Sequence, residues 1–197
     1  MLPAPAVKGI ASGLLMMAFF TIIWSAIAWQ GLSGSGYQWL LLTFTAFCIG
    51  FAYYAIKVFR VVKHAPEPDS PEDIAREKNS GKWFGIIFGA EGLGIFIAIN
   101  IVINLGHSEL TIPVIALVVG LHFYPLAKVF RRTIDYYLAT WSTLVAVLAI
   151  ILTLNKTLNE SSTLAFTGIG LAIATTCYGL YMVLSARPVL KFAAGIE

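Results

Sequence analysis

Six long runs of apolar residues, separated by shorter polar segments, dominate the chain. Each run has roughly the 20 residues that an α-helix needs to cross the hydrocarbon core of a membrane. The runs are continuous, whereas the strands of a membrane β-barrel are shorter and alternate apolar with polar positions. The pattern predicts an all-α, polytopic membrane protein whose residues 1–197 form a single transmembrane domain, with helices over Gly9–Trp29, Tyr37–Val58, Trp83–Leu105, Ile112–Val129, Asp135–Leu154 and Leu164–Leu184.

Three of the links between these runs are short and polar. Gly31–Gly36 joins the first two runs, Gly106–Glu109 joins the third and fourth, and Asn155–Thr163 joins the last two. Pro113 suits the first turn of the fourth helix, where a proline removes no helical hydrogen bond. Links of this length predict that the six helices form three antiparallel hairpins.

The basic residues indicate how the helices are oriented, because loops rich in Lys and Arg stay on the cytoplasmic side of a membrane. Of the 13 Lys and Arg residues, only Lys156 lies in one of the three short links. The others fall on the opposite side: Lys8, Lys57, Arg60, Lys63, Arg76, Lys78, Lys82, Lys128, Arg131, Arg132, Arg187 and Lys191. This asymmetry predicts cytoplasmic N- and C-termini and a multi-pass protein of the inner (plasma) membrane.

The only long link covers residues 61–82, between the second and third runs. Ser70-Pro71-Glu72-Asp73 is typical of a helix start, with a capping serine, a proline in the first position and acidic residues in the first turn. We therefore expect a short cytoplasmic helix over Pro71–Lys78. The nearly neutral charge favours a solvated connector, and a docking or regulatory segment is the alternative.

Composition supports a membrane protein and excludes several other classes. Hydrophobic residues make up 58% of the chain and charged residues 12%, against about 45–50% and about 25% in soluble domains. The net charge is only +3, and no basic tract points to nucleic acid. The two Cys residues form no CxxC motif and no disulfide framework. The sequence also lacks an HExxH motif or a histidine cluster, so we expect neither a bound metal nor another cofactor.

One four-residue sequence occurs twice in the chain. Lys57-Val58-Phe59-Arg60 recurs as Lys128-Val129-Phe130-Arg131, with Tyr53 and Tyr124 at the same offset. Each copy ends an even-numbered span, which is consistent with a duplicated hairpin of the kind found in some transporters. The alternative is that aromatic and basic residues simply mark the cytoplasmic interface. Tyr124 is accordingly either part of a polar vestibule or part of an aromatic belt.

One acidic residue lies deep within a predicted span. An ionisable group in the membrane is costly and is by default a candidate for function. Glu91 lies about 13 Å along the third helix from Lys82, and His122 lies about 9 Å from Lys128 on the next helix. Because the depths are similar and the helices are antiparallel, the two side chains are predicted to face each other. They form either a proton-titrating or cation-binding pair or a neutral hydrogen bond that fixes packing.

The third span is also predicted to be the central, most buried helix. At 100° per residue, Glu91 and Asn100 lie on opposite faces, and Asn104 lies near Asn100. Gly85, Gly89 and Gly92 form a third face of small residues, about 120° from Glu91. A helix with small or polar residues on three faces suits lipid poorly. The candidate substrate- or proton-binding residues are therefore Glu91, His122, Tyr124, Asn100 and Asn104.

Three other residues in the spans have simpler explanations. Asp135 follows Arg131 and Arg132 at the start of the fifth helix, so we expect a helix cap or an exposed ion pair. Pro125 is expected to bend the fourth helix near His122. Buried cysteines usually act as small apolar residues, which is our expectation for Cys48 and Cys177.

The segment Gly120-Leu121-His122-Phe123-Tyr124-Pro125-Leu126-Ala127-Lys128-Val129-Phe130 resembles a motif of uncharacterised bacterial integral membrane proteins, a class defined by a domain of unknown function. Lys8-Gly9, Trp24 and Glu91-Gly92 are similar to that group as well, over about residues 8–150. Only the His-Phe-x-Pro-Leu-Ala core is specific, and the charged loop before the third span is longer here. The resemblance implies six transmembrane helices and no particular activity.

Three functions are compatible with these features. The first is a small transporter or channel-like protein, as a homo-oligomer, with Glu91 and His122 as its ion- or substrate-sensitive pair. The second is a non-catalytic accessory or assembly subunit of a membrane complex. The third is an intramembrane enzyme acting on lipid, which no nucleophile–base set supports. We expect no enzymatic activity. A water-accessible cavity at Glu91 favours the first function, and a dry contact favours the second.

Overall fold

The structure is a computed structural model that describes residues 3–67 and 70–193. These residues are helical apart from short turns and contain no strand. The elements in chain order are α1 (Ala4–Gly31), the 3₁₀ turn η1 (Gln38–Leu41), α2 (Leu42–Val62), α3 (Pro71–Asn104), the 3₁₀ turn η2 (Ser108–Leu110), α4 (Thr111–Phe130), α5 (Thr133–Leu154) and α6 (Glu160–Ala193).

Six of these segments are long and apolar enough to cross a membrane. They coincide with the six predicted runs, and each is extended at one or both ends, as at Ala4 and Val62. The prediction of an all-helical, multi-pass membrane protein is therefore confirmed at this level. Five of the six helices are longer than their apolar runs because residues at the ends continue the same backbone hydrogen bonding, whereas α2 starts five residues later than predicted, after the 3₁₀ turn η1.

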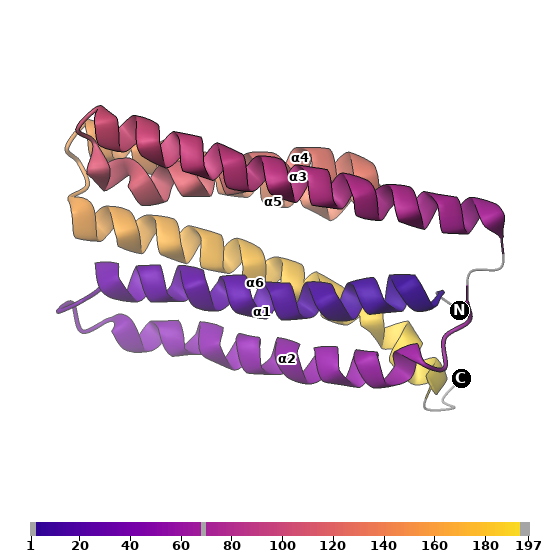
Figure 1. The fold of residues 1–197 in the computed structure, drawn as a ribbon. Helices are drawn as coiled ribbons and strands as arrows, with labels where there is room; N and C mark the ends of the chain where they lie inside the picture. Colours follow the sequence, from indigo (N-terminus) through magenta and orange to yellow (C-terminus); the bar gives the residue numbers. More distant parts are fainter. Residues whose placement is uncertain (1–2, 68–69, 194–197) are drawn as a thin grey trace.

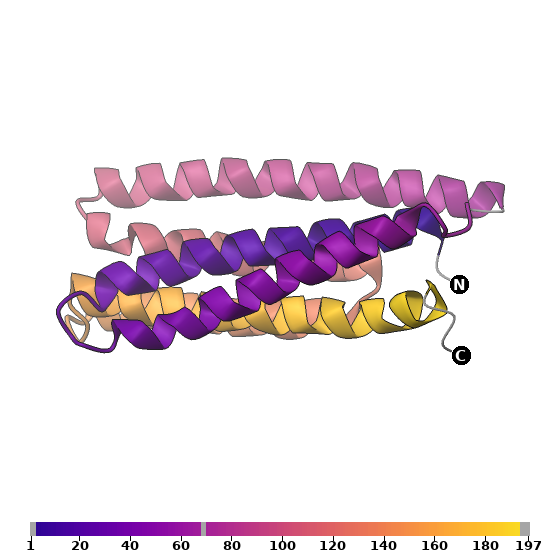
Figure 2. The same ribbon diagram turned by 90° about the horizontal axis from the view of Figure 1, so that it is seen from below.

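The helices lie roughly parallel or antiparallel to a common axis, in two groups (Figure 1). One group contains α1, α2 and α6, and the other contains α3, α4 and α5. Within them α6 packs extensively against α1, and α4 packs against α5. The contact of α5 with α6 joins the groups. The start of α1 and the end of α6 lie at the same end of the bundle (Figures 1 and 2).

The α1–α6 interface is held close by small residues and one buried hydrogen bond. A Cβ atom on Gly168 would come within 2.6 Å of the Ala28 backbone nitrogen, and one on Gly31 would collide with the Ala165 backbone. The side chains of Thr21 and Thr175 hydrogen-bond over 2.7 Å. Small residues allow two backbones to approach, and a polar pair satisfies itself between helices, so this interface is typical of membrane helix packing.

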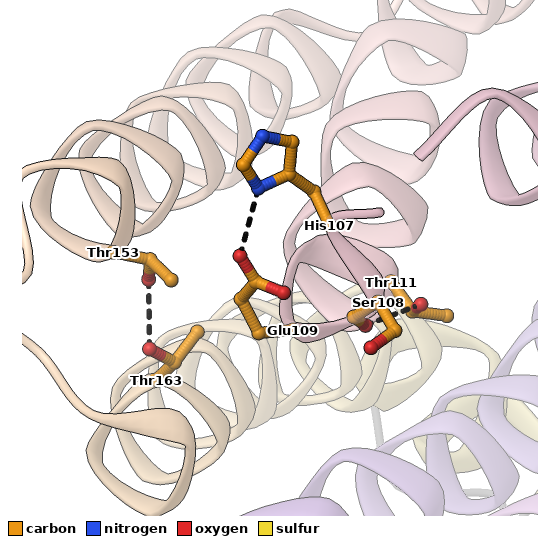
Figure 3. Close-up of polar contacts among 6 residues, drawn as sticks. All are labelled: His107, Ser108, Glu109, Thr111, Thr153 and Thr163. Atoms are coloured by element: carbon orange, nitrogen blue, oxygen red, sulfur yellow. Dashed lines mark hydrogen bonds and ion pairs between the residues drawn. The ribbon is translucent and has the colours of Figure 1, made fainter. Parts of the chain in front are cut away.

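Local hydrogen bonds order the links at the end of the bundle away from the start of α1 (Figure 3). The hydroxyl groups of Thr153 and Thr163 lie 2.7 Å apart and connect α5 with α6. In the link from α3 to α4, Nδ1 of His107 lies 2.9 Å from Oε1 of Glu109. The Thr111 hydroxyl donates to the Ser108 carbonyl oxygen. The Thr111 bond satisfies a backbone carbonyl in the link before α4, and the other two contacts pair polar side chains with each other.

The prediction of a separate short helix over Pro71–Lys78 has the right start but the wrong end. A helix does start at Pro71, and the capping Ser70 hydroxyl accepts a hydrogen bond of 3.1 Å from the Asp73 amide. It then continues without a break to Asn104. Gly81, the only weak helix former near the expected end, costs about 1 kcal/mol, which does not stop a helix of 34 residues. The first turns of α3 therefore project beyond the neighbouring helices (Figures 1 and 2).

The prediction that the third span is the most buried helix is also wrong. In its most apolar 18-residue window, 17% of the α3 residues are buried, against 61% for α6. Among the described residues, α3 packs substantially only against α4, with a smaller contact to η2. The amide nitrogens of Asn100 and Asn104 bond within the helix, since Asn100 Nδ2 donates to the Phe96 carbonyl over 2.7 Å and Asn104 Nδ2 to the Asn100 carbonyl over 2.8 Å. The polar residues of α3 therefore do not require this helix to lie at the centre of the bundle.

Candidate functional site

The structure brings Glu91 and His122 together between α3 and α4, as their matched depth predicts. Oε1 of Glu91 lies 3.3 Å from Nδ1 of His122, and 9% of each side chain is exposed. Glu91 lies on the single face of α3 that contacts α4, next to the buried Ile87. The pair is therefore an interhelical contact that attaches the outermost helix to the rest of the bundle.

The two atoms are close enough for an ion pair, but they are not aligned for a hydrogen bond. Nδ1 of His122 is buried and has no aligned hydrogen-bond partner among the described residues, even though Oε1 of Glu91 is close. The imidazole ring therefore does not point an N–H group at the carboxyl oxygen. A modest rotation of either side chain would align them, because 3.3 Å is only slightly longer than a usual N–H···O distance of about 2.7–3.2 Å.

Aromatic rings surround this pair on the α3–α4 interface. Phe88 meets the His122 ring edge-on, with ring centroids 5.9 Å apart. Phe123 lies beside His122 at 4.2 Å, and Phe84 packs on Phe88 at 4.9 Å. Such a shell excludes water. In that environment a formed hydrogen bond is stronger, and an unpaired polar group is more costly, than at the surface.

The other three candidate residues do not join this pair. Tyr124 points towards α5, where its hydroxyl lies 3.2 Å from the Thr140 hydroxyl. Asn100 and Asn104 are exposed on the face of α3 that is turned away from α4, and their amide groups donate to carbonyl oxygens of their own helix. The five predicted residues therefore form one interhelical contact and two separate polar features. The described part of the structure does not bring all five residues together in one binding site.

Asp135 is a buried residue that the sequence interpretation placed wrongly. It was expected to be a cap or an exposed ion pair, but its side chain is completely buried. The Tyr178 hydroxyl of α6 lies next to its carboxyl group, although neither carboxyl oxygen has an aligned hydrogen-bond partner among the described residues. Arg132 Nη1 donates to the Tyr178 hydroxyl over 3.3 Å. The burial arises because α6 runs past the start of α5 and covers it.

An aromatic contact links the two buried acids across α4. The rings of Phe123 and Tyr178 meet edge-on at 6.0 Å, and Phe123 also lies against His122. Glu91 and His122 therefore lie on one side of Phe123, and Asp135 with Tyr178 on the other. The sequence contained only a weak signal for this arrangement, the tyrosine near the middle of the sixth span.

Two shallow hollows on the molecule lie elsewhere. One runs between α2 and α6 and includes Gly50, Phe51 and Leu180 in its lining. The other lies on α3 and includes Phe96, Asn100 and Asn104. Neither is lined by Glu91 or His122. Within the described part of the chain, no group of three or more His, Cys, Asp or Glu side chains is placed to hold a metal ion.

No protein-family model, curated protein or solved structure matches the chain. The resemblance of the segment around His122 to uncharacterised bacterial membrane proteins therefore stays a prediction, and function has to be argued from the geometry itself.

Proposed function

We propose that this membrane protein is a non-catalytic subunit that assembles with a partner in the bilayer through α3. The observation that carries the proposal is the position of α3, which among the described residues packs substantially only against α4 and leaves four of its five glycines, with Asn100 and Asn104, on faces that no neighbouring helix covers. Small and polar residues on a lipid-facing helix are typical of helix–helix interfaces. A transmembrane helix that served only to face lipid would carry larger apolar residues there.

We further propose that the chain is one transmembrane unit of three antiparallel hairpins, with both termini in the cytoplasm of a cell with an inner (plasma) membrane. The short links and the arrangement in Figure 1 support the hairpins. The distribution of basic residues supports the orientation. In this topology the first turns of α3 project into the cytoplasm, where they would be available to the same partner.

Photo-cross-linking in intact membranes tests the assembly proposal. A photoreactive phenylalanine analogue would replace Phe96, whose side chain is 64% exposed on α3. Phe19 on α1, which is 60% exposed, provides the matched control. We expect a discrete protein adduct from position 96 and only lipid adducts from position 19. The absence of a protein adduct at position 96, or equal adducts at both positions, would contradict the proposal.

A second candidate is a proton-coupled transporter, which is favoured by the acid–base contact of Glu91 with His122 at 3.3 Å inside the membrane region. Histidine exchanges protons near neutral pH, and intramembrane acids commonly serve in proton relays. Purified protein in liposomes that contain a pH-sensitive dye tests this function. Proton uptake that is lost in Glu91→Gln would favour the transporter, and passive behaviour identical to empty liposomes would exclude proton flux under these conditions.

A further inference from the structure

One face of α3 carries a continuous stripe of residues from its cytoplasmic start into the membrane region. At about 100° per residue, the members occupy roughly a third of the helix circumference, on the side opposite Glu91. We call this stripe the α3 outer face: Ile74, Lys78, Gly81, Gly85, Gly89, Gly92, Phe96 and Asn100. All eight residues are exposed. Ile74 is notable because it is 53% exposed in a segment otherwise rich in charge.

The glycines of this face differ from those in the rest of the bundle. A Cβ atom on Gly31, Gly120 or Gly168 would collide with the backbone of a neighbouring helix. A Cβ atom on any of the four glycines of the α3 outer face would meet nothing within 4 Å. At these three positions a glycine allows the backbone of a neighbouring helix to approach closely, whereas Gly94 on the inner side of α3 meets only the Val118 side chain. The four glycines of the α3 outer face leave its backbone open to a similar approach by a further helix.

Asn100 gives an independent indication that the face is covered. Its amide nitrogen donates to the Phe96 carbonyl over 2.7 Å, which leaves the amide oxygen of this exposed side chain free to accept a hydrogen bond. Asn104 repeats the arrangement with the Asn100 carbonyl over 2.8 Å. An acceptor in hydrocarbon has no water to bond, so a donor from another helix stabilises it.

The charges beside the face indicate which partner fits. Lys82 lies at one edge of the stripe, at the same angle as Asn100, and Glu77 lies about 40° beyond the other edge, so the two are about 140° apart around the helix. They are five residues apart and so do not face each other within one helix. Neither forms an ion pair within the described part of the chain. In two parallel helices packed through the stripe, Glu77 of one helix would lie beside Lys82 of the other, as flanking charges do in coiled coils.

We propose that two copies of this chain associate through the α3 outer face, in parallel, around a two-fold axis along the membrane normal. Two copies with the same topology necessarily present α3 in the same direction, so residues at equal depth meet. Glycine then packs on glycine, the Asn100 side chains hydrogen-bond to each other, and each copy contributes one acid and one base to two equivalent ion pairs. The two Lys78 side chains also meet, at the exposed start of the stripe, where water and salt screen their repulsion. Such a self-complementary surface is what a two-fold interface requires. This inference rests on the proposed function and names its partner.

Disulfide cross-linking tests the orientation of the interface. The background would carry Cys48→Ala and Cys177→Ala, which remove one buried and one exposed cysteine. Gly89→Cys places a thiol in the outer face, and Ala90→Cys, one residue on, places an exposed thiol outside it at nearly the same depth. We expect mild oxidation in membranes to give a disulfide-linked dimer for Gly89→Cys only. Equal dimer yields for the two variants, or a dimer from Ala90→Cys alone, would overturn the proposal.

A charge exchange tests the partner contact without altering the glycines. Dimerisation of labelled protein would be measured by energy transfer in liposomes at a series of protein-to-lipid ratios. We expect Glu77→Lys and Lys82→Glu each to weaken the dimer roughly fivefold. The double exchange should restore it, because the two charges meet only between chains. Equal dimerisation in all four proteins, or additive loss in the double exchange, would show that these residues do not pair.

The adduct from position 96 separates failure of this inference from failure of the proposed function. An adduct with the mass of two copies of this chain supports both. An adduct with a different protein, together with no disulfide dimer from Gly89→Cys, overturns the homodimer and leaves assembly through α3 in place. No protein adduct and no disulfide dimer would overturn both.

Discussion

Glu91 and His122 illustrate how buried polar residues depend on each other inside an apolar interface. Each side chain is almost enclosed by α3, α4 and the surrounding aromatic rings. Loss of one partner leaves the other without a polar contact where water does not reach, whereas loss of both removes the need for either. The free energy of unfolding should therefore respond differently to single and double substitutions.

We expect Glu91→Ala and His122→Ala each to lower the free energy of unfolding in detergent by about 2 kcal/mol. The double variant should lose less than the sum, by at least about 0.5 kcal/mol. Glu91→Gln should be milder than Glu91→Ala, since an amide keeps a polar group of similar size beside the imidazole. Thermal unfolding followed by circular dichroism measures these differences. Strictly additive losses would show that the two residues are not coupled.

The exposed contact of His107 with Glu109 provides the matched control for this experiment. Its two atoms are closer, at 2.9 Å, but both side chains are accessible to solvent. Exposed ion pairs contribute little because water competes for both partners. Glu109→Gln should therefore leave thermal unfolding unchanged, and a loss equal to that of Glu91→Ala would contradict the role assigned to burial.

At the scale of elements, the arrangement depends on how closely each pair of helices can approach. The α1–α6 pair is close because glycines and a threonine hydrogen bond occupy the contact. The α4–α5 pair uses the same device, since a Cβ atom on Gly120 would come within 2.7 Å of the Thr143 backbone nitrogen. By contrast, Gly50 on α2 has open space around it, so its sequence position alone does not indicate a helix contact.

Gly168→Ala is expected to destabilise the protein by about 1–3 kcal/mol, because the added methyl group meets the rigid backbone of α1 and pushes two helices apart. Gly50→Ala is the control. It adds the same methyl group where nothing is displaced, and alanine is the better helix former, so the midpoint of thermal unfolding should stay level or rise slightly. A loss of the same size in both variants would contradict the proposed packing at Gly168.

At the scale of the whole molecule, the distribution of basic residues indicates how the bundle is oriented in the membrane. The end of α2 and the first turns of α3 lie at the same end of the bundle as the start of α1 and the end of α6 (Figure 1). The links at the opposite end are short, and Lys156 is the basic residue found there. By the positive-inside rule, this distribution supports the proposal that the first end faces the cytoplasm.

Labelling of introduced cysteines tests this orientation. In a cysteine-free background, Ser33→Cys and Glu160→Cys should react with a membrane-impermeant maleimide added to intact cells. Ala75→Cys, on the projecting part of α3, should react only after the membrane is permeabilised. Ser33 is preferred to Gly34, whose φ of +78° disfavours any residue with a side chain. Reaction of Ala75→Cys in intact cells would reverse the assigned topology.

The sequence by itself determined the properties that depend on local order along the chain. Apolar runs of sufficient length specified the six helices, Ser70-Pro71 specified where α3 begins, and distance from the basic residues placed Glu91 and His122 at one depth. These features follow from helix geometry and from the energy of moving residues between water and hydrocarbon.

Only the tertiary structure decided which face of each helix is covered. In a bilayer the solvent is as apolar as the protein interior, so hydrophobicity does not distinguish a buried face from a lipid-facing one. For this reason α3 proved peripheral despite its polar residues, and Asp135 proved buried despite its place at a helix start. The contact of Thr21 with Thr175 joins residues separated by nearly the whole chain. Such contacts arise from close steric fit between helices, which the order of residues along one helix does not contain.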